Sequence, residues 1–218
     1  MNMTRGKNAL FSLLLLGTLM LLTGCKDNER RALITTDEGD ITIMLYNTTP
    51  KHRDNFIKLA ESGFYDSLLF HRVIDGFMIQ GGDPTSKNAP EGQQLGSGGP
   101  GYEVPAEIGS PHIHGALAAA RSASPDKRSS GSQFYIVTGV LQNETELDYY
   151  EQQKNIKYNE SQRRLYMNLG GFPGLDMEYT VYGEVISGMD VVEKISKAQK
   201  DAHDRPLKDI RMKIKMLN

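Results

Sequence analysis

Short runs of apolar residues recur along most of the chain, and in some of them apolar and other residues alternate. In the run at 40–46, Ile41, Ile43 and Leu45 are each separated by a single residue of another kind. This period of two is typical of a strand with one buried face, and glycine-rich turns between such runs favour a barrel or a sandwich. The pattern predicts eight strands, at 32–36, 40–46, 68–74, 77–80, 116–120, 134–138, 180–186 and 210–217.

Two other segments have the spacing of helices. The first begins at Thr49 and Pro50, a hydroxyl cap followed by proline in the first turn, and Gly63 ends it. Phe56 lies on its apolar face. The second helix is predicted at about 189–200. The chain is therefore expected to form a mainly β domain with two helices.

Residues 143–173 interrupt this pattern. The segment is rich in charged residues, tyrosine, asparagine and glutamine, and 151–169 is predicted to form an exposed helix. We interpret it as an insertion. A solvated helical excursion is the favoured interpretation, and a flap that binds a partner or selects substrates is the alternative.

The N-terminus resembles an export signal. Arg5 and Lys7 precede an apolar run at 9–22, which is shorter than the roughly 20 residues of a membrane-spanning helix. The run ends in Leu-Thr-Gly-Cys, which resembles the lipobox of bacterial lipoproteins. This resemblance implies a signal peptide at 1–24 and a diacylated thiol at Cys25; an ordinary signal with an incidental cysteine is the alternative.

Composition narrows the class of protein only slightly. Cys25 is the one cysteine, so no internal disulfide is expected, and 25–31 is predicted to be a lipidated tether. Loss of the signal removes two cations and no anions and moves the net charge from −2 to −4. A mildly acidic domain is a poor candidate for binding nucleic acid. By analogy with other lipoproteins, Lys26 favours the outer membrane of the cell envelope, on its periplasmic or surface face.

Several sequence blocks resemble, in order, those of the cyclophilin-type peptidyl-prolyl cis–trans isomerases. They lie at 70–74 (Phe-His-Arg-Val-Ile), 77–83 (Phe-Met-Ile-Gln-Gly-Gly-Asp), 96–102, 105–107, 131–136, 175–176, 179–183 and 188–192. The resemblance covers 32–218 apart from the insertion. It implies a closed eight-stranded antiparallel β-barrel capped by two α-helices, with a substrate groove on its outer face, and a monomer that binds proline-containing polypeptides.

Rotation about an X–Pro bond breaks no covalent bond. It must overcome the amide resonance, a barrier of about 20 kcal/mol, so a site that favours the twisted amide is sufficient. No metal or cofactor is expected. The resemblance assigns Arg72 as the catalytic donor to the amide nitrogen, and Gln80 as the residue that binds the substrate backbone and helps to hold the arginine.

The remaining substrate contacts are also implied by the resemblance. Phe77, Met78, Tyr135 and Leu175 match the apolar proline pocket, Ala120 and Arg121 the strand edge that pairs with the peptide, and Gln133 the adjoining groove. Tyr179 is also expected to contact the substrate. For Arg121 the match concerns the backbone alone. Without the resemblance, core packing would be the ordinary interpretation of the apolar residues, and a surface ion pair that of Arg72.

Three positions depart from the family pattern. Tyr135 replaces a frequent phenylalanine, and its hydroxyl needs water or a partner. Gly174 stands where many eukaryotic members have tryptophan, which argues against tight cyclosporin binding. Tyr179 stands where those members have histidine.

Other motifs carry less weight. The glycines at 96, 98 and 101 match a dinucleotide fingerprint, but no helix follows them. His71, His112 and His114 lack a partner at ligand spacing and are expected to be solvated loop residues. The leading hypothesis is thus an isomerase that assists the folding of exported proteins. The alternative is a non-catalytic proline-peptide-binding chaperone or scaffold that uses the groove and the insertion.

Overall fold

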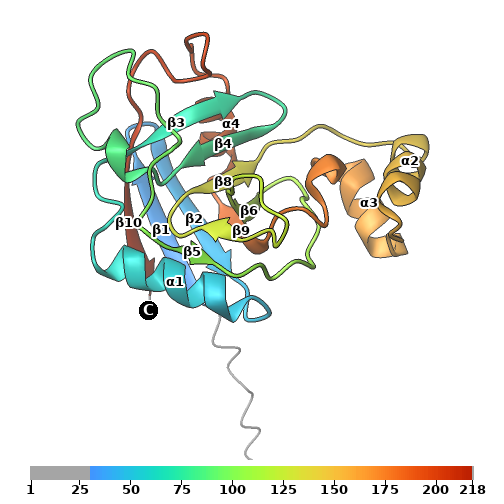
Figure 1. Ribbon diagram of the computed structural model, residues 1–218. Coiled ribbons are helices and arrows are strands. Elements are labelled where there is room, and N and C mark those ends of the chain that lie inside the picture. The colour runs from blue at the N-terminus through green and yellow to red at the C-terminus, as the bar shows by residue number, and fades with distance from the viewer. Residues whose placement is uncertain (1–29, 218) are drawn as a thin grey trace, which may run out of the picture.

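A closed antiparallel barrel dominates the computed structural model, which describes residues 30–217 (Figure 1). The strand order around the barrel is β1-β10-β3-β4-β8-β6-β9-β2, and β2 pairs with β1 to close it. The predicted fold class is confirmed. The strands are β1 (Arg30–Thr36), β2 (Gly39–Leu45), β3 (Leu68–Ile74), β4 (Met78–Gly81), β6 (Ala116–Ala119), β8 (Phe134–Val137), β9 (Val181–Ser187) and β10 (Arg211–Leu217), with β5 (Glu103–Val104) and β7 (Ser129–Ser130) forming a separate pair.

The first strand begins earlier than the sequence predicts. The signal peptide at 1–24 and Cys25 lie outside the described residues. Arg30 and Arg31 belong to β1, where they face Leu45 and Met44 of β2 in the ladder. The domain therefore starts two residues before the predicted boundary at 32.

The barrel wall separates two apolar clusters. On β8, Phe134 and Ile136 point into the barrel core, whereas Tyr135 and Val137 belong to a second cluster on the outer side. Successive side chains of a strand point to opposite faces of the sheet, so one short strand contributes to both. The outer cluster forms the base of the candidate site.

Aromatic rings fill the barrel interior. The ring of Phe134 lies edge-on to Phe56, Tyr65 and Phe70, with centroids 5.9, 5.8 and 6.1 Å away. This edge-to-face geometry is a preferred one for aromatic pairs. The interior is thus a packed core made by side chains from strands, loop and helix.

Two helices contribute to this core. Phe56 and Leu59 of α1 (Pro50–Glu61) and Val192 and Ile195 of α4 (Met189–Ser196) are buried in it. In Figure 1, α1 lies along the lower end of the barrel. The second helix ends at Ser196, before the predicted end at 200, because the chain turns back and Leu207 N–H donates to Gln199 O at 2.8 Å.

The start of α1 corrects a second prediction. Thr49 occupies the N-cap position but makes no side-chain cap; its hydroxyl lies 3.5 Å from Tyr46 O. The carboxylate of Glu107 accepts instead from Lys51 N–H at 3.1 Å and His52 N–H at 3.0 Å. A negative charge at a helix N-terminus is favourable, and it satisfies N–H groups that have no partner within the helix.

The insertion forms two helices, not the single helix predicted at 151–169. They are α2 (Glu144–Lys154) and α3 (Glu160–Asn168), which lie together at one side of the barrel (Figure 1). Asn155 ends α2 in the left-handed conformation, with φ of 50°. Asn159 then starts α3, where its side chain accepts from Gln162 N–H in a capping box.

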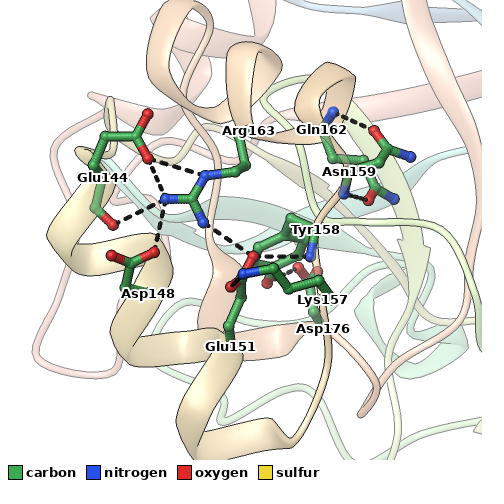
Figure 2. A network of polar contacts seen from close by, with 9 residues as sticks. All are labelled: Glu144, Asp148, Glu151, Lys157, Tyr158, Asn159, Gln162, Arg163 and Asp176. Carbon is green, nitrogen blue, oxygen red and sulfur yellow. Dashed lines mark hydrogen bonds and ion pairs between the residues drawn. The ribbon is translucent and has the colours of Figure 1, made fainter.

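Both helices have a buried side. Leu147, Tyr158 and Tyr166 form a small cluster of their own. Across the two helices, the guanidinium of Arg163 contacts Glu144, Asp148 and Glu151 (Figure 2). The prediction of a merely exposed helix was therefore wrong. Within residues 30–217, none of the helices is long and apolar enough to cross a membrane.

Phe134→Ala tests the aromatic core. We expect it to lower the free energy of unfolding by about 3–5 kcal/mol, because it removes a ring on which three others pack. Leu207→Ala, at a position that is 60% exposed, is the control and should change it by less than about 0.5 kcal/mol. Urea unfolding measures both; equal midpoints for the two variants would contradict the packing described.

Candidate active site

A pocket of about 410 Å³ lies on the outer face of the barrel. Its walls come from β3, β4 and β8, from the residues that follow β6, and from loops on either side. The lining residues are His71, Arg72, Phe77, Met78, Gln80, Gln93, Gln94, Leu95, Gly96, Ala120, Arg121, Tyr135, Leu175, Tyr179, Asp201, His203 and Arg205. Nine of the ten predicted catalytic and substrate-binding residues are among them, and Gln133 lies behind the wall.

The floor of the pocket is apolar. Met78 of β4 and Tyr135 of β8 are buried at its base, beside Phe77 and Leu175. Leu175 comes from η2 (Pro173–Leu175), a short 3-10 turn at the end of the insertion. Phe77 packs against Phe172, with ring centroids 4.5 Å apart. The floor can therefore accept a small apolar ring.

Arg72 provides a cation at the edge of this floor. Its side chain is 42% exposed, and its Nε lies 3.6 Å from Asp204 Oδ2. Lys200 Nζ contacts the other carboxylate oxygen of Asp204 at 2.8 Å. The guanidinium is thus held at one side only and keeps donors open to a ligand.

Gln80 makes a different contact from the one expected. It faces Arg72 across the β3–β4 ladder, but its Nε2 donates to Gln133 Oε1 at 3.0 Å. Gln133 Nε2 in turn donates to Gly96 O at 3.0 Å and to Gly98 O at 2.7 Å. The two glutamines therefore tie the loop at 96–98 to the barrel, and Asp204 is the partner of Arg72.

A buried carboxylate shapes the same loop. Asp83 Oδ2 accepts from Gly96 N–H at 2.6 Å and Gly98 N–H at 3.1 Å. Burial would raise the pKa of Asp83, but these hydrogen bonds and those from Thr85 outweigh burial and lower it. A Cβ at Gly98 would lie 2.1 Å from Asp83 Oδ1, so glycine is required there. The glycines at 96 and 98 thus allow a loop to wrap around the Asp83 carboxylate, and they do not form a dinucleotide-binding turn before a helix.

The strand edge beside the pocket lies at Arg121. Ala120 N–H donates to Gln133 O at 3.0 Å and its C=O accepts from Ser130 N–H at 2.8 Å, so both of its backbone groups are used. Within residues 30–217, Arg121 makes no backbone–backbone hydrogen bond. The structure therefore favours Arg121, and not Ala120, as the residue whose backbone can pair with a peptide.

The Arg121 side chain also belongs to the pocket wall. Its Nη2 donates to Glu178 Oε2 at 3.0 Å, and its guanidinium carbon lies 4.8 Å from the ring centroid of Tyr179. A cation over an aromatic face is attracted by the ring. The family resemblance assigned only the backbone of Arg121, because its side chain differs from the asparagine of many eukaryotic cyclophilins.

The hydroxyl of Tyr135 has the partner that its burial requires. Tyr135 Oη lies 3.0 Å from His112 Nε2, and His112 Nδ1 lies 2.8 Å from Asp176 Oδ1. The expectation of a solvated His112 was wrong: its side chain is fully buried. Sequence reasoning missed His112 and Asp176 as site residues, although the need of the Tyr135 hydroxyl for a partner was the signal that pointed to one.

His71 lines the pocket but is buried, which corrects its predicted exposure. Burial lowers the pKa of His71 to about 4, against the opposing effect of Asp83, while Arg72 and Arg205 add to the lowering. Within the described residues, neither of its ring nitrogens has a hydrogen-bond partner. His71 is therefore neutral near neutral pH. His114 is partly buried and lies 3.3 Å from Glu193.

Comparisons with known proteins agree on one family. The family model described as "Cyclophilin type peptidyl-prolyl cis-trans isomerase/CLD" matches residues 31–216. A Staphylococcus saprophyticus protein, provisionally named a peptidyl-prolyl cis-trans isomerase, is 36% identical over 191 residues, which are 87% of this chain and 92% of that protein. A Staphylococcus haemolyticus protein with the same provisional name is 34% identical over 186 residues, 85% of this chain and 89% of its own.

Solved structures give the same result. A cyclophilin type peptidyl-prolyl cis-trans isomerase of Cryptosporidium parvum is similar with a TM-score of 0.62 and 25% identity, over 87% of this chain and 98% of that chain. The structure of the same protein in the presence of the dipeptide Ala-Pro has a TM-score of 0.61 and 25% identity, over 86% and 99%.

The neutral state of His71 makes stability depend on pH. Its pKa is about 4 when folded and 6.5 as the ordinary value, so between these values only the unfolded chain binds the proton. Acidification through this window therefore removes about 3 kcal/mol of unfolding free energy through this group alone.

His71→Gln should lose less stability between pH 6.5 and 4 than the wild type does, by about that amount. Leu207→Ala, an exposed position without an ionisable side chain, is the control and should keep the wild-type pH dependence. Urea unfolding across this pH range measures the difference. Parallel curves for wild type and His71→Gln would show that His71 titrates normally.

Proposed function

The chain belongs to the cyclophilin-type peptidyl-prolyl cis–trans isomerases, and we propose that it catalyses rotation about X–Pro bonds in the outer-face pocket. The observation that carries this proposal is an apolar floor directly beside an open guanidinium, that of Arg72. The Ala-Pro dipeptide present with the Cryptosporidium neighbour supports a proline ligand for this fold.

In the proposed mechanism the proline ring enters the apolar floor. Phe77, Met78 and Leu175 would hold the ring, while the backbone of Arg121 pairs with the peptide. As the amide twists, its nitrogen loses conjugation and becomes a hydrogen-bond acceptor. The guanidinium of Arg72 donates to it and so stabilises the twisted amide more than the planar one.

The polar side chains in the pocket wall suit a polypeptide ligand better than an isolated small molecule. Gln80 lines the pocket next to Arg72, and its amide is oriented by Gln133. A preoriented amide next to the ring site suits the backbone of residues that flank proline. Proteins with X–Pro bonds are therefore the proposed substrates, and assistance with their folding the proposed role.

We also propose that the protein is a lipoprotein of the cell envelope. The Leu-Thr-Gly-Cys sequence that ends at Cys25 supports this, together with the basic and apolar residues before it. Because β1 begins at Arg30, only four residues separate the proposed lipid from the barrel. The substrates would then be exported proteins, and the outer membrane is the proposed site.

Arg72→Ala tests the enzymatic proposal. In a protease-coupled assay on residues 26–218, we expect the wild type to accelerate isomerisation of an Ala–Pro peptide. The variant should lose about a hundredfold in kcat/KM, since the donor acts in the transition state. Arg211→Ala, which changes an exposed arginine on β10, is the control and should keep wild-type activity.

A folded wild type without activity on a range of X–Pro peptides would refute the isomerase. The chain would then be better described as a non-catalytic proline-peptide-binding chaperone or scaffold. Isothermal titration with the same peptides would detect such binding.

Cys25→Ser tests the lipid anchor. In a bacterial host fed an alkyne-tagged fatty acid, the full-length wild type should take up the label and sediment with membranes. The variant should do neither, because Cys25 is the one thiol of the chain. Gradient separation of the membranes and protease treatment of whole cells would then locate the protein. A labelled Cys25→Ser protein would contradict the proposal.

A further inference from the structure

A chain of buried hydrogen bonds links the insertion to the pocket floor. It centres on Asp176, whose two carboxylate oxygens serve different parts of the fold. Oδ2 accepts from the hydroxyls of Tyr158 and Tyr166, each at 2.6 Å, and Figure 2 shows Tyr158 beside Asp176. Oδ1 accepts from the backbone N–H of His112 at 2.8 Å and lies at the same distance from its Nδ1. His112 reaches the Tyr135 hydroxyl with its other ring nitrogen.

Because the side chains in this series of hydrogen bonds are buried, each polar group needs a partner within the series, and the direction of each hydrogen bond matters. All five side chains are buried. Burial raises the pKa of the Tyr135, Tyr158 and Tyr166 hydroxyls, so each remains a protonated donor. An ionised carboxylate only accepts hydrogen bonds, and without donors its burial would be very costly. The insertion supplies two of the four donors to the Asp176 carboxylate.

The direction of every bond then follows. In the uncharged form of His112 the single ring proton lies on Nδ1, because this nitrogen is 2.8 Å from the Asp176 carboxylate, which accepts it. Nε2 is then the acceptor, and Tyr135 donates its hydroxyl proton to it. Tyr135 lines the pocket, and its hydroxyl oxygen then has lone pairs but no proton to donate to a ligand.

The rest of the insertion holds the two tyrosines in place. Glu151 Oε1 accepts from the backbone N–H of Tyr158 at 3.0 Å, and Arg163 Nη1 donates to the same oxygen at 3.0 Å (Figure 2). Lys154 Nζ donates to the backbone carbonyl of Asp176 at 2.9 Å, which brings a positive charge close to the carboxylate. Arg163, which joins α2 to α3, thus also orients the Glu151 carboxylate that holds Tyr158, the residue that donates to Asp176.

We propose that the insertion positions the substrate pocket: Tyr158 and Tyr166 donate to the Asp176 carboxylate and hold it in place, which fixes the tautomer of His112 and thereby the orientation of the Tyr135 hydroxyl. This inference rests on the proposed function, in which Tyr135 lies under the proline ring. Tyr158, Tyr166, Asp176 and His112 are positioning residues that act through Tyr135. The fixed hydroxyl offers the pocket an acceptor and never a donor, which disfavours substrate groups that need a donor there.

A double-mutant cycle tests this coupling. In the Ala–Pro assay, Tyr158→Phe/Tyr166→Phe should raise KM about three- to tenfold and leave kcat within about twofold, since Arg72 is untouched. In a Tyr135→Phe background the same pair of changes should have no further effect on KM. Tyr149→Phe, on the exposed side of α2, is the matched control and should behave as the wild type.

An equal rise in KM in the wild-type and Tyr135→Phe backgrounds would overturn the proposal, since the insertion would then act by packing alone. No rise in either background would also overturn it. Cooperative thermal unfolding of each variant serves as the check of folding. If the paired variant does not fold, the single changes Tyr158→Phe and Tyr166→Phe enter the same cycle.

The tautomer of His112 provides a readout that does not depend on activity. In ¹⁵N NMR spectra of the wild type at about pH 8, where an ordinary imidazole is neutral, we expect the proton of His112 on Nδ1. A proton on Nε2 would mean that His112 donates to the Tyr135 hydroxyl, which is the opposite hydrogen-bond direction, and would refute the proposal. An inactive wild type with the Nδ1 proton would count against the isomerase but leave the coupling intact.

Discussion

Closure of the barrel decides where chemistry can take place in this protein. An eight-stranded barrel is just wide enough for its own side chains, and rings around Phe134 fill the interior. A polypeptide substrate must therefore bind outside. Because successive side chains of a strand point to opposite faces, Phe134 packs in the core and the next residue, Tyr135, lies at the floor of the pocket. The apolar floor is thus the reverse side of the wall that stabilises the fold, so its position is as rigid as the barrel itself.

Carboxylates with little exposure to solvent organise the segments that lie outside the strands. Glu107 caps α1, Asp83 gathers the loop at 96–98, and Asp176 joins the insertion to the pocket. Each is surrounded by N–H or hydroxyl donors, as a buried negative charge requires. The same requirement explains how long loops acquire one conformation without strands or disulfides. Around the pocket, Asp83 holds a loop of the wall and Asp176 supports the floor through His112. Asp204 contacts the guanidinium of Arg72.

Local patterns predicted what depends on local contacts. The apolar run at 68–74 located that strand at both ends. The family resemblance, a different kind of evidence, named ten site residues, and nine of them line one pocket. Long-range polar contacts escaped prediction. Glu107 caps a helix through N–H groups 56 and 55 positions earlier in the chain, and Asp176 meets His112 across 64 residues. No periodicity records such pairs, because they depend on how loops pack. The missing Thr49 cap has the same cause, since a distant carboxylate took its place.

The position of the insertion in the chain explains how its contacts can affect the pocket. It begins a few residues after β8, which carries Tyr135, and ends at η2, which carries Leu175. Both ends are therefore attached to the pocket floor. A phenylalanine in place of Tyr135 would need no hydrogen-bond partner, and an apolar floor could then be built without a buried charge. The tyrosine hydroxyl requires a partner, His112 can be that partner through Nε2 only when its proton lies on Nδ1, and that proton requires an acceptor in Asp176. The insertion supplies the hydroxyl donors that hold the Asp176 carboxylate in place, so the hydroxyl of Tyr135 and the helices at the side form one structural unit.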